Sequence, residues 1–210
     1  MSRGLGDVYK RQLEGGRMLE RMLDMDMGEV RIGASDMTLQ FFLLPFLEQF
    51  HKEYPRIKVT VTNAPTPETI CSLEEGKIDF GVVTTPFSCK STIHSMMVKP
   101  IGTVFIAGDS FGELKGKKLD YSILGSLPCI FLEKNTSTRA FMDAFLSAKG
   151  MELTPEFELA TSDMIVQFAK RNMGVGCVMD GFAKDAIAKG EVFELDFKEK
   201  MPLRHICVVT

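Results

Sequence analysis

The chain of 210 residues is 45% hydrophobic and 25% charged, a composition that can form one large domain or two smaller ones with their own cores. Its net charge of -3 and isoelectric point near 5.7 argue against direct nucleic-acid binding, because neutralising phosphates requires a basic face. No apolar run is long enough to span a bilayer, and residues 1–12 lack the apolar core of a secretory signal. We therefore expect a soluble, cytoplasmic protein that has no membrane partner.

The beginning of the chain is expected to lie outside the folded domain. Residues 1–12 join no hydrophobic pattern and are predicted to be a non-native leader. Residues 13–27 are rich in Met, Leu, Glu and Arg, and within them Leu19, Met22 and Leu23 recur at helical spacing. This segment is predicted to be the end of a longer linker helix.

Strands and helices alternate in the predicted structure of the next part of the chain. Strands are predicted at residues 30–33, 57–61 and 78–83 from their apolar or alternating patterns. The helix after the first strand has an apolar stripe at Leu43, Phe46, Leu47 and Phe50. Pro45 must lie in an early turn of this helix or at a kink, because proline removes one helical hydrogen bond.

The same alternation continues to the end of the chain. A helix is predicted to begin with Thr66 as its N-cap and Pro67 as its first residue. Later strands are predicted at residues 103–107, 129–132, 157–160, 175–179, 192–197 and 205–209. Later helices are predicted at residues 137–148, at 162–171 with Ser162 as the cap, and at 182–188. This order indicates an α/β fold with parallel sheets in two lobes.

Hydroxyl-rich loops follow four of the predicted strands where the next helix begins, and a Thr-Thr pair follows a fifth strand. In a parallel sheet these strand ends share one edge, where the N–H groups of helix N-termini attract a small anion. The pattern predicts ligand binding, not catalysis, by Ser35, Thr38, Thr66, Thr84, Thr85, Asn135, Thr136, Thr138 and Ser162. Taken singly, each of these side chains is also of a type that commonly caps helices.

Catalytic motifs are not evident in the sequence. There is no G-x-S-x-G elbow and no S-x-x-K pair, and residues 112–117 have one residue too few between their glycines for a phosphate loop. Gly174 and Gly176 are predicted to be a helix stop followed by a close-packed strand. Asp79 and Asp163 are acid–base candidates by position only.

The cysteines and histidines predict no metal site and no cofactor. The cysteines are odd in number and form no C-x-x-C pair, and three of them lie in apolar patterns, so buried reduced thiols are expected. The histidines are far apart in sequence, which argues against a shared metal ion. The residues concerned are Cys71, Cys89, Cys129, Cys177, Cys207, His51, His94 and His205.

Several runs of residues match a known protein family in order and spacing. They are residues 28–35 (GEVRIGAS), the Leu-Leu-Pro at 43–45, the F-x-x-x-Y-P at 50–55, residues 75–83 (EGKIDFGVV) and residues 174–179 (GVGCVM). Residues 13–210 thereby resemble the effector-binding domain of LysR-type transcriptional regulators. The resemblance implies a fold like that of type 2 periplasmic binding proteins, with two Rossmann-like lobes joined by two crossover segments and the effector in the interlobe cleft.

The resemblance also assigns the lobes and the effector contacts. It places residues 28–100 and 180–210 in the first lobe and residues 101–179 in the second. It implies effector contacts from Ser35 and Thr66 in the first lobe, and from residues 135–138 and Ser162 in the second.

The function implied is that of a ligand-sensing domain that binds a small, anionic metabolite and controls DNA binding by an N-terminal winged helix-turn-helix. That helix-turn-helix and the usual final helix are absent from this chain, and residues 35–45 are one residue longer than the commonest spacing. A homodimer or tetramer is implied as well. Phe41 and Phe42 give the helix at residues 39–50 more than one apolar face, which predicts a partner surface.

Two other functions are compatible with a fold of this kind. A periplasmic solute-binding protein of a transporter would need a signal peptide, which this start does not show. An enzyme such as a porphobilinogen deaminase relative would need a catalytic acid and a cofactor-binding cysteine. The sequence does not name the effector, because hydroxyl-lined sites suit carboxylates, sulfate-like anions and sugar acids alike.

Overall fold

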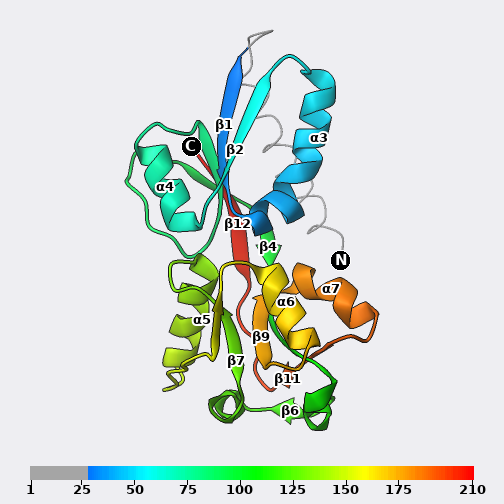
Figure 1. Ribbon diagram of the computed structural model, residues 1–210. Coiled ribbons are helices and arrows are strands. Elements are labelled where there is room, and N and C mark those ends of the chain that lie inside the picture. The colour runs from blue at the N-terminus through cyan, green and yellow to red at the C-terminus, as the bar shows by residue number, and fades with distance from the viewer. Residues whose placement is uncertain (1–27) are drawn as a thin grey trace, which may run out of the picture. The chain divides into compact units, whose positions relative to one another are not determined.

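The computed structural model describes residues 28–210 and has the expected α/β architecture (Figure 1). The predicted leader at residues 1–12 and the predicted linker helix at residues 13–27 lie outside the described residues. The described chain forms two compact units. Unit 1 comprises residues 28–100 together with Arg204–Thr210, and unit 2 comprises Ile101–Leu203.

Unit 1 contains a five-stranded sheet with the strand order β2-β1-β3-β12-β4. Its strands are β1 (Glu29–Ala34), β2 (Lys58–Asn63), β3 (Phe80–Thr84), β4 (Ser95–Ile101, ending on the first residue of unit 2) and β12 (Arg204–Val209). Strand β1 is parallel to both of its neighbours, with Ile32 opposite Val61 on one side and Phe80 on the other. Strand β12 is antiparallel to β3. The ends of β1, β2 and β3 therefore share an edge with the beginning of β12.

The helices of unit 1 follow these parallel strands. They are α2 (Asp36–Thr38), the π-helical segment η1 (Leu39–Leu43), α3 (Leu44–Glu53) and α4 (Thr66–Glu74), and Figure 1 draws α3 and α4 on either side of the sheet. The first three form one continuous helix, and Pro45 lies near the start of α3, as predicted. The segment η1 is a wider, π-helical turn, in which the N–H of Leu44 bonds the carbonyl of Leu39.

Unit 2 contains a second five-stranded sheet with the order β10-β5-β9-β7-β8, and a two-stranded sheet of β11 and β6. Its strands are β5 (Thr103–Ala107), β6 (Lys118–Leu119), β7 (Cys129–Leu132), β8 (Phe157–Leu159), β9 (Val175–Met179), β10 (Phe193–Glu194) and β11 (Asp196–Phe197). Its helices are α5 (Ser137–Ser147), α6 (Ser162–Lys170) and α7 (Asp180–Ala188), with 3-10 segments η2 (Asp109–Leu114) and η3 (Tyr121–Ser126).

Aromatic packing organises the core of unit 2. The ring of Tyr121 stacks on that of Phe197 with centroids 4.1 Å apart, and Phe105 meets both rings edge-on. The buried thiols of Cys129 and Cys177 belong to the same core. Buried aromatic pairs in these geometries add about 0.5–1.5 kcal/mol each beyond the area that they bury.

Three expectations about the fold were wrong in detail. The sheets are mixed, because β12 runs antiparallel to β3 and β5 runs antiparallel to β9. Residues 180–203 belong to unit 2, not to the first lobe, because β10 pairs with β5 and β11 pairs with β6. The predicted strand at residues 192–197 is two short strands that join different sheets.

Replacing Gly33 with alanine is expected to lower the free energy of unfolding by about 1–3 kcal/mol. The added Cβ would stand 2.6 Å from Cδ1 of Ile78 and 2.7 Å from Cγ2 of Thr69, so the packing of α4 on β1 would have to shift. Urea denaturation followed by circular dichroism measures the change. Gly28→Ala is the control, since its Cβ would meet nothing within 4 Å. Equal stability of Gly33→Ala and the parent chain would contradict this account.

Candidate functional site

Two of the predicted hydroxyl residues lie together where β1 leads into α2. The hydroxyl of Ser35 accepts the N–H of Thr38 at 3.3 Å, and the hydroxyl of Thr38 accepts the N–H of Ser35 at 2.9 Å. The two side chains therefore form a reciprocal capping box. Thr38 is fully buried, and its hydroxyl also donates to the carbonyl of Val82 on β3 at 2.9 Å. This bond ties the start of the helix to the neighbouring strand.

Thr66 and Thr84 lie together at the same edge of unit 1. Thr66 is the first residue of α4 and is buried, and its hydroxyl accepts the N–H of Thr84 at 3.3 Å. The prediction that Thr66 is the N-cap was wrong by one residue. The N-cap is Pro65, whose carbonyl already accepts the N–H of Thr69 at 3.0 Å.

Thr85 brings a buried arginine into the same neighbourhood. The N–H of His205 donates to the hydroxyl of Thr85 at 2.9 Å, and Nη1 of Arg204 donates to the Thr85 carbonyl at 3.4 Å. The Arg204 residue is only 1% exposed. No arginine was predicted at the site from the sequence. Arg204 is a charged residue directly before the last predicted strand of the chain, and this position was a signal that could have found it. Unit 1 thus places five predicted hydroxyl residues and one guanidinium along a single sheet edge, called here the hydroxyl edge.

The remaining predicted residues lie in unit 2, at the starts of α5 and α6. Thr136 is the N-cap of α5 and accepts the N–H of Arg139 at 3.2 Å, while Asn135 beside it is exposed and Thr138 is buried. Ser162 is buried as the first residue of α6, and the N-cap is Thr161, which corrects the predicted cap by one residue. Strands β7 and β8 are parallel, so both helices begin at one edge of their sheet.

The two aspartates that the sequence offered as acid–base candidates are, in the structure, an ion-pair partner and an exposed residue of a helix. Asp79 accepts two bonds at 2.7 Å from Arg31, one from its backbone N–H and one from Nη2. Hydrogen bonding to the Arg31 side chain, together with its backbone bond and positive charge, holds the pKa of Asp79 below its ordinary value of 3.8. Asp163 is exposed in the first turn of α6. The pairing of Asp79 with Arg31 does not suit a proton-transferring carboxyl, and Asp163 is a charge at a helix start that faces solvent.

Two of the buried cysteines are poor candidates for a nucleophile. All five are free thiols, with three buried as expected and Cys71 and Cys89 exposed. Burial raises the pKa of Cys129 to about 12 and that of Cys207 to about 11. The thiols of Cys129 and Cys207 therefore stay protonated at neutral pH.

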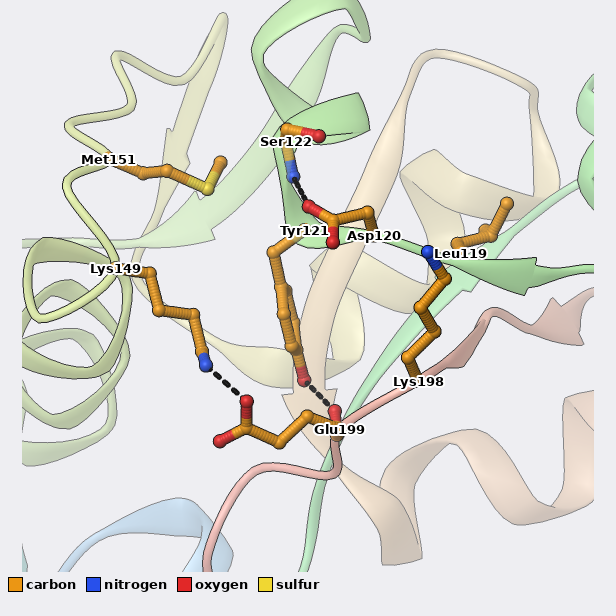
Figure 2. Close-up of a pocket in the computed structure, with 8 residues that line it drawn as sticks. All are labelled: Leu119, Asp120, Tyr121, Ser122, Lys149, Met151, Lys198 and Glu199. Carbon is orange, nitrogen blue, oxygen red and sulfur yellow. Dashed lines mark hydrogen bonds and ion pairs between the residues drawn. The ribbon is translucent and has the colours of Figure 1, made fainter.

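A separate cavity of about 190 Å³ lies in unit 2, and none of the predicted residues lines it (Figure 2). Lys149 pairs with the carboxylate of Glu199 at 2.5 Å, and the hydroxyl of Tyr121 donates to the Glu199 backbone carbonyl at 3.0 Å. Burial raises the pKa of Tyr121 to about 12. Because these groups already bind one another, the hydroxyl edge of unit 1 remains the stronger candidate site.

The comparison with protein families decides the identity of this domain. The LysR substrate binding domain family matches residues 24–210, which is most of the chain. The chain belongs to the LysR family. Membership of this family of transcriptional regulators makes the chain a regulatory domain and not an enzyme, and it displaces the solute-binding and deaminase-like alternatives.

Relatives of the LysR domain agree with this assignment. The HTH-type transcriptional regulator YeiE of Escherichia coli K12 is 21% identical over 183 residues, covering 87% of this chain and 62% of YeiE. The Synechocystis CcmR regulatory domain in complex with 2-PG has a TM-score of 0.77 at 19% identity, covering 88% of each chain. The effector-binding domain of QuiR in complex with shikimate has a TM-score of 0.75 at 14% identity, covering 88% of this chain and 87% of QuiR. The chain thus spans about three fifths of the length of YeiE and has the fold of LysR regulatory domains.

The described part of the LysR domain shows neither a metal-binding cluster nor a membrane-spanning helix. Across residues 28–210, no group of three or more His, Cys, Asp or Glu side chains is placed to hold a metal ion. Over the same residues, no helix combines the length and apolarity needed to cross a bilayer.

Replacing Asp79 with asparagine is expected to lower stability at pH 7 by about 1 kcal/mol, since both partners of the ion pair are partly exposed. The folded-state pKa of Asp79 is depressed, so its contribution is present above pH 4 and is lost as the pH falls through the folded value. Urea denaturation of both proteins at pH 7 and at pH 3 or below measures this. A stability difference that stays constant with pH would contradict the pairing.

Proposed function

We propose that this chain is the effector-sensing domain of a cytoplasmic LysR-type regulator, and that it binds a small anionic metabolite through the hydroxyl edge of unit 1. Binding of this ligand would control a DNA-binding part that lies outside residues 1–210. The net charge of -3 supports the assignment of ligand binding to this chain and of DNA binding to another part, because the chain as a whole has no excess of positive charge to neutralise DNA phosphates.

The observation that carries the proposal is the convergence of hydroxyls, helix starts and a guanidinium at one edge of unit 1. Ser35 and Thr38 lie at the start of α2, and Thr66 lies at the start of α4. Arg204 supplies a buried positive charge beside Thr85. Hydrogen bonds from a cation to an anionic ligand are roughly twice as strong as bonds between neutral groups. Such an edge favours a carboxylate, sulfate or phosphate group over a neutral ligand.

The ligands named for two structural neighbours support the same class. The CcmR regulatory domain was solved with 2-PG and the QuiR domain with shikimate, which is a carboxylate. Because identity to both is below 20%, these names suggest a panel of small anions and no single compound.

A thermal-shift screen of sulfate, phosphate, shikimate and other small organic acids tests the proposed function. An anion at 100 times its dissociation constant is expected to stabilise the chain by about 2.7 kcal/mol. Ser35→Ala is expected to weaken binding of that anion by about 1 kcal/mol, measured by calorimetry. Asp120→Ala is the matched control, because it removes the cap of η3, outside the predicted site residues. Equal affinities of the two variants would remove Ser35 from the site, and no stabilising anion would count against the proposed function.

We also propose that the chain forms a homodimer through the α3 face of unit 1. Phe42 is buried, which corrects its predicted place on the partner surface, whereas Leu44 is 55% exposed. Met97 is 52% exposed and points to the same side of β4 as Lys99, whose ammonium reaches Phe41. The exposed apolar side chains of Leu44 and Met97 support a protein contact at this face, which the oligomeric state of the chain tests.

Leu44→Glu is expected to shift the chain from dimer to monomer at tens of micromolar, because a charge in an apolar contact must lose its hydration. Sedimentation velocity measures the change. Gln49→Lys introduces a charge at another exposed position of α3 and is expected to leave the dimer intact. A parent chain that sediments only as a monomer would contradict this proposal.

A further inference from the structure

Pro45 creates a local problem in the continuous helix from Asp36 to Glu53. In a regular α-helix the N–H of residue 45 would bond the carbonyl of Phe41, but proline has no N–H and its ring collides with that carbonyl. The structure widens the turn at this point into η1, in which the N–H of Leu44 bonds the carbonyl of Leu39, five residues back. The wider turn makes room for the ring.

Lys99 supplies a donor to the same carbonyl. Its ammonium group donates to the Phe41 oxygen at 3.0 Å, and the side chain is half-buried. Lys99 lies on β4, an edge strand of the unit 1 sheet and distant from the helix in sequence. The contact therefore fastens the widened turn to the edge of the sheet.

The segments on both sides of this contact matter for the proposed function. Toward the N-terminus, η1 continues directly from α2, whose first turn carries Ser35 and Thr38. On the strand side, Lys99 is followed by Pro100, the last residue of unit 1 before the chain enters unit 2. A change in the geometry of the turn would therefore move the start of α2 at the hydroxyl edge and the end of β4, where the chain leaves unit 1.

We propose that Lys99 is a positioning residue for effector recognition, which replaces the missing amide of Pro45 and holds the widened turn in register. The inference rests on the proposed function, because it concerns the same hydroxyl edge. Lys99 acts through the Phe41 carbonyl, and its ammonium fixes the direction in which the first turn of α2 presents its N–H groups. Loss of the contact allows the turn to sample other registers, so the edge is preorganised less well for an anion.

The experiment compares Lys99→Met with Lys99→Arg in the full chain. Methionine keeps an unbranched stem without the donor, and arginine keeps a cationic donor. Amide hydrogen exchange over residues 36–46 reports on the turn without any ligand, and calorimetry with sulfate, phosphate and shikimate reports on affinity. Lys99→Met is expected to speed exchange and to weaken anion binding, each by about tenfold, as for the loss of one charge-assisted hydrogen bond. Lys99→Arg is expected to restore both to within about threefold.

Pro45→Ala separates this role from a general packing effect. Alanine restores an N–H at the position that an α-helix would use for the Phe41 carbonyl, so the turn no longer depends on Lys99. In the Pro45→Ala background, Lys99→Met is expected to change exchange and affinity by less than about threefold. An equal effect of Lys99→Met in both backgrounds would overturn the proposal.

Unchanged exchange over residues 36–46 in Lys99→Met would overturn it as well, whatever the anions do. If no probe anion binds the parent chain, the proposed function fails, and the exchange measurements still decide whether Lys99 holds the turn. If an anion binds the parent chain and Lys99→Met equally well, the positioning role is wrong and the proposed function stands.

Discussion

Parallel pairing of β1 with both β2 and β3 is the constraint on which the candidate site of unit 1 depends. This register brings the ends of three strands to one edge, and two of them lead directly into helices whose first N–H groups face the same region. Hydroxyl side chains at these positions serve two purposes. They cap or brace the helix starts, as in the bond from Thr38 to Val82, and they line the edge with groups that can bind an anion.

Strand β12 adds a buried positive charge to the hydroxyl edge. Because it runs antiparallel to β3, its first residue lies beside the end of β3, and Arg204 is buried next to Thr85. A guanidinium held by the sheet in this way keeps its place without the entropy cost that ordering a mobile surface arginine would bring. The edge therefore combines neutral donors from three strand ends with a fixed charge from a fourth strand.

Local patterns predicted much of this arrangement, while contacts between distant segments were missed. The strand ends and their hydroxyl loops were predictable because periodicity and helix-start residues are properties of adjacent residues. Thr66 and Ser162 were misplaced by one position, since the exact start of a helix depends on which carbonyl accepts its first bond. Arg204, Lys99 and the position of residues 180–203 depend on pairing across the chain, which no local pattern encodes. The π-helical turn before Pro45 was not predicted from the sequence either, because its register depends on which carbonyl each N–H reaches.

The strand order of unit 1 has a consequence for how the chain takes shape during synthesis. Strand β12 is inserted between β3 and β4, although some hundred residues separate it from both of them in the sequence. Unit 2 is continuous from Ile101 to Leu203, so all of its strands leave the ribosome before the last strand of unit 1 does. Domains generally fold as units while the chain emerges. Unit 1 is therefore the first unit to be synthesised in part and the last to complete its sheet. Its buried Arg204 is added only with that final strand.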